Sequence, residues 1–97
     1  MILYNISIII DDSSHDDLFP WIKSHLKTLT VETNLLKMLD SPHEGTTYCI
    51  QVRAADPSAI EAYQAEILPA LSEYIAAKHQ EKAFLFDSKM EYLPLDQ

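Results

Sequence analysis

The chain has 97 residues, enough for one domain with a modest core, and its 47% hydrophobic and 23% charged content is that of a globular protein. The net charge is −8 and Arg53 is the single arginine, so the surface repels phosphate backbones and anionic lipids, and we expect neither a nucleic-acid nor a membrane partner. The single glycine argues against a glycine-rich phosphate loop, and the single cysteine excludes an internal disulfide or a zinc knuckle.

Residues 2–10 form the first predicted element, a β-strand in which bulky apolar residues alternate with a mixed set. This stretch lacks a basic lead-in and a small-residue cleavage site, and it is too short to span a bilayer as a helix. We therefore interpret it as a buried strand and not as a signal segment. We expect one domain over residues 1–97 and a cytoplasmic location.

A helix is predicted to follow, with Ser14 as N-cap and Asp17 completing an approximate capping box. Pro20 lies early in this helix and is expected to bend it slightly. The helical spacing of apolar residues defines its buried stripe, which consists of Leu18, Trp21, Ile22, His25, Leu26 and Leu29.

Residues 31–40 are less clear, because Leu35–Leu39 could continue a helix or form a strand. We favour a strand, since residues 41–45 form a turn and a strongly alternating strand, residues 46–54, comes next.

Asp56 and Pro57 then predict the start of a second helix, as N-cap and first helical residue. Its stripe is Ile60, Tyr63, Ile67, Leu71, Tyr74 and Ile75, and Pro69 is expected to kink it. Residues 83–93 are the last predicted strand.

The order of these elements predicts an α+β, ferredoxin-like β-α-β-β-α-β fold, a four-stranded antiparallel sheet with both helices on one face. Strands 2–10 and 46–54 are expected at its centre. We expect the helices to cover the apolar face of the sheet, which is formed by alternate strand residues: Tyr4, Ile6, Ile8, Tyr48, Ile50, Val52, Phe84 and Phe86. The open face is then expected to carry Leu3, Asn5, Ser7, Ile9, Thr47, Cys49, Gln51, Arg53, Leu85, Asp87, Lys89 and Glu91. With Leu3, Ile9 and Leu85 that face is too apolar for full exposure, so it is predicted to form a homodimer.

Several stretches together resemble a bacterial family, domain of unknown function four-two-eight-six. They are residues 1–6, Trp21-Ile22-Lys23 with His25, Gly45-Thr46-Thr47-Tyr48, Tyr63-Gln64-Ala65-Glu66 with Pro69-Ala70-Leu71, and the strand over residues 84–91. The resemblance implies a ferredoxin-like fold of the dimeric α/β-barrel kind. It implies no activity and no catalytic residues.

Most residues that could carry chemistry have a simpler interpretation. The acids around His15, residues 11–17, lack the ligand spacing of a calcium loop, and helix capping accounts for them. The four histidines are scattered; His25 could line a cleft and act as a base, but we favour a partly buried structural histidine. Cys49 lies mid-strand and is expected to pack. We expect no catalytic residues, no metal site and no cofactor.

Arg53 is the sharpest candidate for binding, because a guanidinium on the open face could clamp a small anionic ligand through its carboxylate or phosphate. An ordinary ion pair with Asp87 or Glu91 explains it more simply, and we favour that. The predicted ligand-binding set is Asn5, Ser7, His25, Gln51 and Arg53.

We therefore predict a homodimeric domain that uses its open sheet face for self-association, and we favour a non-enzymatic role. Small-ligand or protein binding at the dimer cleft is compatible with this prediction. The alternative is a small cofactor-free enzyme, monooxygenase- or isomerase-like, of the dimeric α/β-barrel superfamily.

Overall fold

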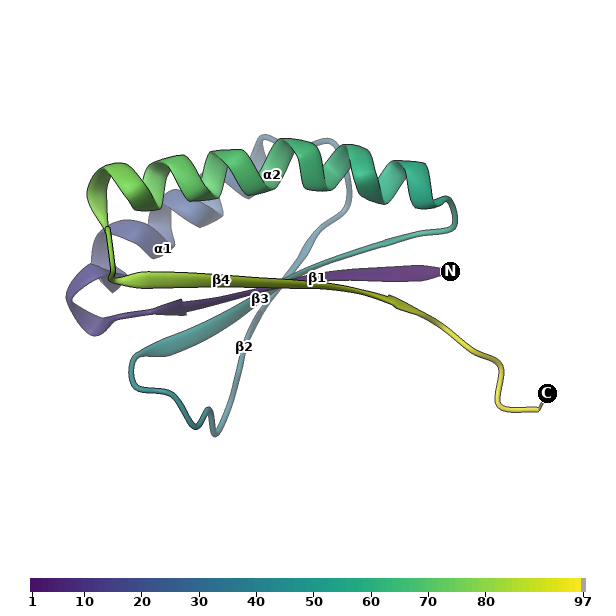
Figure 1. Cartoon of the computed structure of the whole chain (residues 1–97), viewed down its shortest axis with the longest axis horizontal. Coiled ribbons are helices and arrows are strands. Elements are labelled where there is room, and N and C mark those ends of the chain that lie inside the picture. Colours follow the sequence, from purple (N-terminus) through teal and green to yellow (C-terminus); the bar gives the residue numbers. More distant parts are fainter. Residues whose placement is uncertain (97) are drawn as a thin grey trace.

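The computed structural model describes residues 1–96 and contains four strands and two helices in the predicted order. They are β1 (Ile2–Ile10), α1 (Asp12–Lys27), β2 (Asn34–Lys37), β3 (Thr46–Ala54), α2 (Pro57–Lys78) and β4 (Ala83–Glu91). The strands form one antiparallel sheet in the order β2-β3-β1-β4, with both helices on one side (Figure 1). The ferredoxin-like prediction is confirmed. Among the described helices, none is long and apolar enough to cross a membrane.

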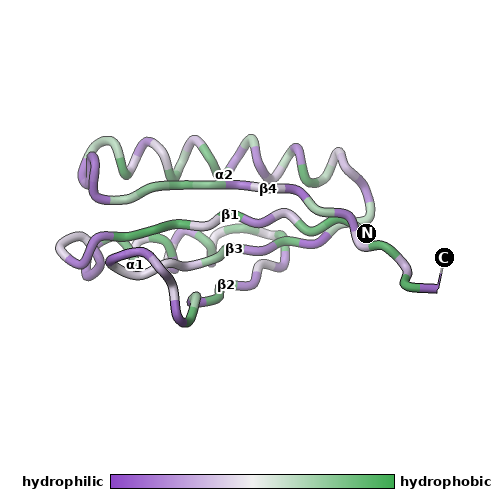
Figure 2. The backbone as a smooth tube through the Cα atoms, turned by 60° about the horizontal axis from the view of Figure 1, so that its bottom comes forward, coloured by the Kyte–Doolittle hydropathy of each residue, from purple (hydrophilic) through white to green (hydrophobic). Residues whose placement is uncertain are grey.

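The hydrophobic core lies between the helices and the sheet. Alternate residues of β1 and β3 point toward the helices, and Figure 2 shows the four strands side by side beneath α2. Burying these side chains is the main force that holds the layers together. The fully buried large side chains are Tyr4, Ile6, Ile8, Ile10, Leu18, Ile22, Ile50, Ile60, Ile67 and Leu71.

The helix ends agree in part with the sequence. Asp56 caps α2 as predicted, and its carboxylate accepts a hydrogen bond from the amide of Ser58 at 2.9 Å. The cap of α1 is Asp11, not Ser14, which is buried within the helix. Asp11 accepts a hydrogen bond from the amide of Ser13 at 2.9 Å, so the helix begins three residues earlier than predicted. Both helices continue through their internal prolines.

β2 is shorter than the ten residues predicted. It ends at Lys37, and Asp40 adopts a left-handed backbone with φ of 56° that starts the turn. Gly45 closes this turn with φ of 80°, and a Cβ there would lie 2.2 Å from the carbonyl oxygen of Ile10. The one glycine therefore stands where no side chain fits.

The predicted faces of the last strand were wrong. In the observed register Ser7 is opposite Phe86 and Ile6 is opposite Asp87, so the phenylalanines lie on the open face. Phe84 and Phe86 are 53% and 60% exposed. The residues of β4 on the helix side are Ala83, Leu85, Asp87, Lys89 and Glu91. The alternation was identified correctly, but pairing register, not hydrophobicity, decides which side faces the helices.

Candidate functional site on the open face of the sheet

The open face is built from rows of side chains that run across the strands, because directly opposed residues point to the same side. The register gives four such rows on β4, β1 and β3, and β2 with the residue after it extends three of them. The apolar rows are Phe84, Ile9, Thr47 with Met38, and Phe86, Ser7, Cys49 with Leu36. The polar row is Ser88, Asn5, Gln51 with Asn34. Met90, Leu3 and Arg53 form the last row.

Charge is nearly absent from this face. The strands contain five charged residues in all, and Lys37, Asp87, Lys89 and Glu91 point to the helix side. Arg53 is the one charged strand residue on the open face. In a chain with 22 charged residues this is a strong bias, and depletion of charge is typical of the centre of protein interfaces.

The polar groups of this face are linked to one another. Gln51 donates from Nε2 to Oδ1 of Asn5 at 3.1 Å, and Asn5 donates from Nδ2 to Oγ of Ser7 at 3.0 Å. Ser7 Oγ also lies 3.7 Å from the Sγ of Cys49. These half-buried side chains already hold fixed positions, so covering them by another surface would cost less than covering free amides.

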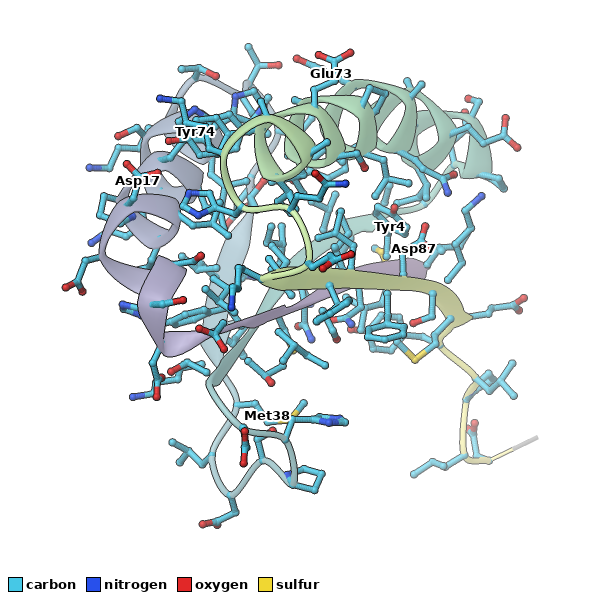
Figure 3. All side chains as sticks on the ribbon, turned by 60° about the vertical axis from the view of Figure 1, so that its left-hand side comes forward. Tyr4, Asp17, Met38, Glu73, Tyr74 and Asp87 are labelled. Carbon is cyan, nitrogen blue, oxygen red and sulfur yellow. The ribbon has the colours of Figure 1, made fainter. Side chains whose placement is uncertain are left out.

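Exposed apolar side chains surround this polar group. Phe84, Phe86 and Met90 lie along β4, Leu36 lies on β2 and Met38 directly follows β2, all between 41% and 60% exposed. The loop of residues 38–45 and the segment after β4 both leave the sheet on the side away from the helices (Figure 1). Met38 lies on that side in Figure 3, opposite Asp17 and Tyr74. The open face is thus bounded by apolar residues on both edges.

The structure brings together most of the predicted ligand-binding set. Asn5, Ser7 and Gln51 form the hydrogen-bonded group, and Arg53 is exposed in the next row of the same face. The predicted partners of Arg53 were wrong, because Asp87 and Glu91 lie on the other face.

His25 lies apart from this set on α1, across the sheet. Its ring stacks on Trp21 with 5.2 Å between ring centres, and its buried Nε2 has no hydrogen-bond partner among the described residues. His25 therefore contributes nothing to a site on the open face.

The sequence did not reveal three polar contacts on the helix side. Asp87 accepts hydrogen bonds from the hydroxyl of Tyr4 at 2.8 Å and from Gln64 at 2.9 Å. Burial and the hydrogen bond to Asp87 raise the pKa of Tyr4. No local motif marks such a contact, because residues 4, 64 and 87 meet only in the folded chain.

The second contact joins the two helices. Asp17 accepts from the hydroxyl of Tyr74 at 2.7 Å and lies 2.7 Å from Nε2 of the buried His79. The hydrogen bond from Tyr74, and then that from His79, lowers the pKa of Asp17. The ring of Tyr74 stacks on Trp21 at 4.1 Å, so this cluster fixes α1 against α2.

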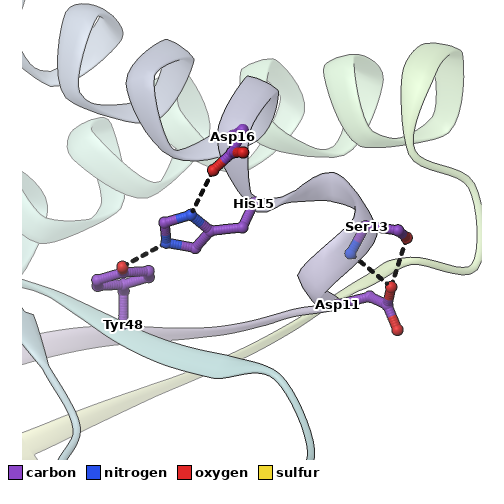
Figure 4. A network of polar contacts seen from close by, with 5 residues as sticks. All are labelled: Asp11, Ser13, His15, Asp16 and Tyr48. Atoms are coloured by element: carbon purple, nitrogen blue, oxygen red, sulfur yellow. Dashed lines mark hydrogen bonds and ion pairs between the residues drawn. The ribbon is translucent and has the colours of Figure 1, made fainter.

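The third contact is at the start of α1. His15 Nε2 lies 2.6 Å from the hydroxyl of Tyr48, and Asp16 lies 3.5 Å from its Nδ1 (Figure 4). Phe19 stacks on Tyr48 at 4.2 Å. The acidic segment 11–17 thus caps the helix through Asp11 and packs it through its neighbours, which accounts for these residues structurally.

The fold and the open face define this protein as a ferredoxin-like α+β domain with one uncovered sheet face. The chain belongs to the family described as domain of unknown function DUF4286, whose family model matches residues 1–93. No curated protein matches the chain.

Solved structures show the same fold at low sequence identity. A de novo designed protein, Foldit4, has a TM-score of 0.63 and 12% identity, with 95% of this chain and 98% of that chain covered. An antibiotic biosynthesis monooxygenase has a TM-score of 0.61 and 16% identity, with 97% and 100% covered. A Dabb family protein from Mesorhizobium loti, with a ferredoxin-like fold, has a TM-score of 0.59 and 11% identity, with 97% and 100% covered. A designed protein and a monooxygenase share this fold, so the fold alone selects no activity.

Proposed function

We propose that this domain is a self-association module whose two copies pair through the open faces of their sheets. The observation that carries the proposal is the composition of that face. It holds a single charged strand residue and five of the eleven large apolar side chains that are exposed among residues 1–96, namely Leu36, Met38, Phe84, Phe86 and Met90. A monomer rarely leaves such a patch in water. A two-fold pairing covers it on both copies at once.

The size of the face supports this proposal. Nine-residue strands rise about 3.3 Å per residue and neighbouring strands lie about 4.8 Å apart, so the sheet covers roughly 30 Å by 19 Å. Side-chain relief and the two projecting segments add to that area. A stable interface buries about 800 Å² on each partner, which this surface can supply.

The test is the oligomeric state of purified protein and of one charged variant. We expect sedimentation equilibrium and native mass spectrometry to give a dimer for the wild type at micromolar concentration. Phe86→Asp should give a monomer, because it places a carboxylate in the middle of the apolar rows. Its circular dichroism should be unchanged, since Phe86 is already exposed in one copy.

Ala65→Asp is the matched control, because it adds the same charge on the exposed side of α2 and should leave the dimer intact. A wild type that stays monomeric at high micromolar concentration contradicts the proposal. So does an Ala65→Asp variant that dissociates as fully as Phe86→Asp.

Small-ligand binding belongs to the same proposal. Between paired sheets, Arg53 with Asn5, Ser7 and Gln51 would offer one positive charge and several hydrogen-bond donors to a small anion. A reproducible extra mass on the native dimer, lost in Arg53→Ala, would support it. The alternative, a cofactor-free enzyme, has less support because His25 and Arg53 lie on opposite sides of the sheet.

A further inference from the structure

The segment after β4 is apolar and uncovered. The amide of Tyr92 still donates to the carbonyl of Met1 at 3.0 Å, which extends the pairing with β1 by one residue. Pro94 cannot donate to a ladder, and the chain leaves the sheet on its open-face side (Figure 1). Leu93 is 73% exposed and Leu95 is fully exposed. Two leucines of the segment after β4 are therefore not covered by other parts of their own chain.

A groove lies at the same end of the sheet, beside β2. It has a volume of about 270 Å³ and is lined by Met1, Val31, Glu32, Asn34 and Arg53. Val31 is 43% exposed and Met1 is 58% exposed, so its wall is partly apolar. Arg53 forms no ion pair among residues 1–96. The groove thus offers apolar surface and one free guanidinium.

The rows of the open face indicate how two copies would pair. A two-fold axis parallel to the strands lays β4 of one copy over β2 of its partner and keeps each row above the same row. Phe86 then covers the partner's Leu36, and Phe84 covers the partner's Met38. An axis across the strands would instead reverse the rows and set Phe84 over the row that contains Arg53. Matching apolar to apolar and polar to polar favours the first arrangement.

We infer that the C-terminal segment, residues 93–96, docks in this groove on the partner copy. The inference rests on the proposed self-association, because the strand-parallel axis places the end of β4 over the start of the partner's β2. Leu93 and Leu95 would cover the apolar wall, and Asp96 would lie near the partner's Arg53. Charge complementarity and apolar fit thus point to one occupant, a second copy of this chain.

A free small anion fits the groove less well. Glu32 lines it together with Arg53, so an anion alone would meet a carboxylate as well as the guanidinium. The C-terminal segment offsets that repulsion with two buried leucines. This is why we assign the groove to the segment. A small anion bound to Arg53 between the paired sheets would compete with Asp96 of the segment for the guanidinium.

The first experiment measures the dimer dissociation constant by sedimentation for three proteins. They are a chain that ends at Tyr92, the Arg53→Ala variant, and the two changes combined. We expect the shortened chain to dissociate about tenfold or more readily, the loss for one well-covered leucine. Arg53→Ala should weaken the dimer less, and the combined change should cost less than the two effects multiplied. An unchanged dissociation constant for the shortened chain overturns the inference.

Cross-linking tests the placement directly. On a Cys49→Ser background, Leu95→Cys protein is mixed with Val31→Cys protein and treated with a short bis-maleimide. We expect a cross-linked dimer that contains one chain of each kind. The matched control pairs Leu95→Cys with Leu39→Cys. Residue 39 lies in the loop at the other end of the sheet (Figure 1), so we expect no cross-link between these two positions.

Cross-linking of Leu95→Cys to Leu39→Cys in preference to Val31→Cys would place the segment at the other end of the partner's β2 and would overturn the inference. The two proposals fail in different ways. A monomeric wild type ends the self-association proposal. If the wild type is a stable dimer and its dissociation constant is unchanged by the shortening and by Arg53→Ala, only the assignment of the groove is contradicted.

Discussion

Gly45 stands where the loop after β2 turns into β3, and its surroundings leave no room for a side chain. Its φ of 80° is left-handed, and a Cβ would lie 2.2 Å from the carbonyl oxygen of Ile10. We expect Gly45→Ala to lower the free energy of unfolding by roughly 2–4 kcal/mol, from backbone strain and overlap together. Urea unfolding measures this loss.

Glu44→Ala is the matched control at the preceding exposed position, and it should change the unfolding midpoint little. Equal midpoints for the two variants would mean that the loop can move away from Ile10, and that the turn does not depend on glycine.

Asp17 provides a pH-dependent contact between the helices. The hydrogen bond from Tyr74, and then that from His79, lowers its pKa in the folded protein, with Lys78 contributing charge. A lowered folded pKa means that this stabilisation is complete above the unfolded pKa, about 3.9, and is lost as pH falls through the folded value. We therefore expect Asp17→Asn to reduce stability at neutral pH and to approach the wild type in strong acid.

Urea unfolding of both proteins between neutral pH and strong acid tests this expectation. Asp12→Asn, at another exposed acid of α1, is the control and should show no such convergence. A difference between wild type and Asp17→Asn that stays constant with pH would show that the carboxylate charge is not what stabilises the cluster.

At the scale of elements, β4 is held to the helix layer by a contact near its middle. Asp87 accepts from Tyr4 of β1 and from Gln64 of α2, which joins three elements through one carboxylate. We expect Tyr4→Phe to cost about 1–2 kcal/mol, because it removes one hydrogen bond to a charged group and leaves the packing of the ring. The unfolding midpoint in urea measures it.

Tyr92→Phe is the matched control, since its side chain is half exposed and lies outside the strands. Its midpoint should equal that of the wild type. A Tyr4→Phe variant as stable as this control would mean that Gln64 alone, with water, satisfies Asp87.

How far the sequence predicts these elements depends on whether the signal is local. Alternation in β1 and β3 and the Asp56-Pro57 start of α2 are local patterns, and they were identified correctly. The faces of β4 were wrong because register is a contact between distant residues, and Phe86 lies opposite Ser7 for that reason. An edge strand can also expose its aromatics when another surface is available to cover them.

The candidate site shows the same division. Asn5, Ser7 and Gln51 were placed together because parity along central strands follows from the sequence once the topology is known. Arg53 was placed on the right face but given partners from the wrong one. The inclusion of His25 was wrong, because His25 lies on α1, across the sheet from the open face. No spacing in the sequence specifies where a helix residue lies relative to the far side of a sheet.

At the scale of the whole molecule, the charge of the chain opposes the association that its open face favours. Each copy carries −8, and four of the five strand charges, all except Arg53, lie away from the proposed interface. Salt screens repulsion between the two copies, with a Debye length of about 10 Å at 0.1 M and about 30 Å at 0.01 M. Salt also weakens the proposed pairs between Arg53 and Asp96, but these involve far less charge than the mutual repulsion.

We therefore expect the dimer to tighten severalfold as sodium chloride is raised from about 0.01 M to about 0.1 M, because the repulsion is screened over that range. Sedimentation equilibrium at each salt concentration measures the dissociation constant. A Glu66→Gln, Glu73→Gln variant, which removes two exposed charges from α2, should bind more tightly at low salt and depend less on salt. Phe86→Asp should stay monomeric throughout. If the wild-type dimer instead weakens with salt, ion pairs and not apolar rows hold the two sheets together, and Arg53 becomes the first residue to change.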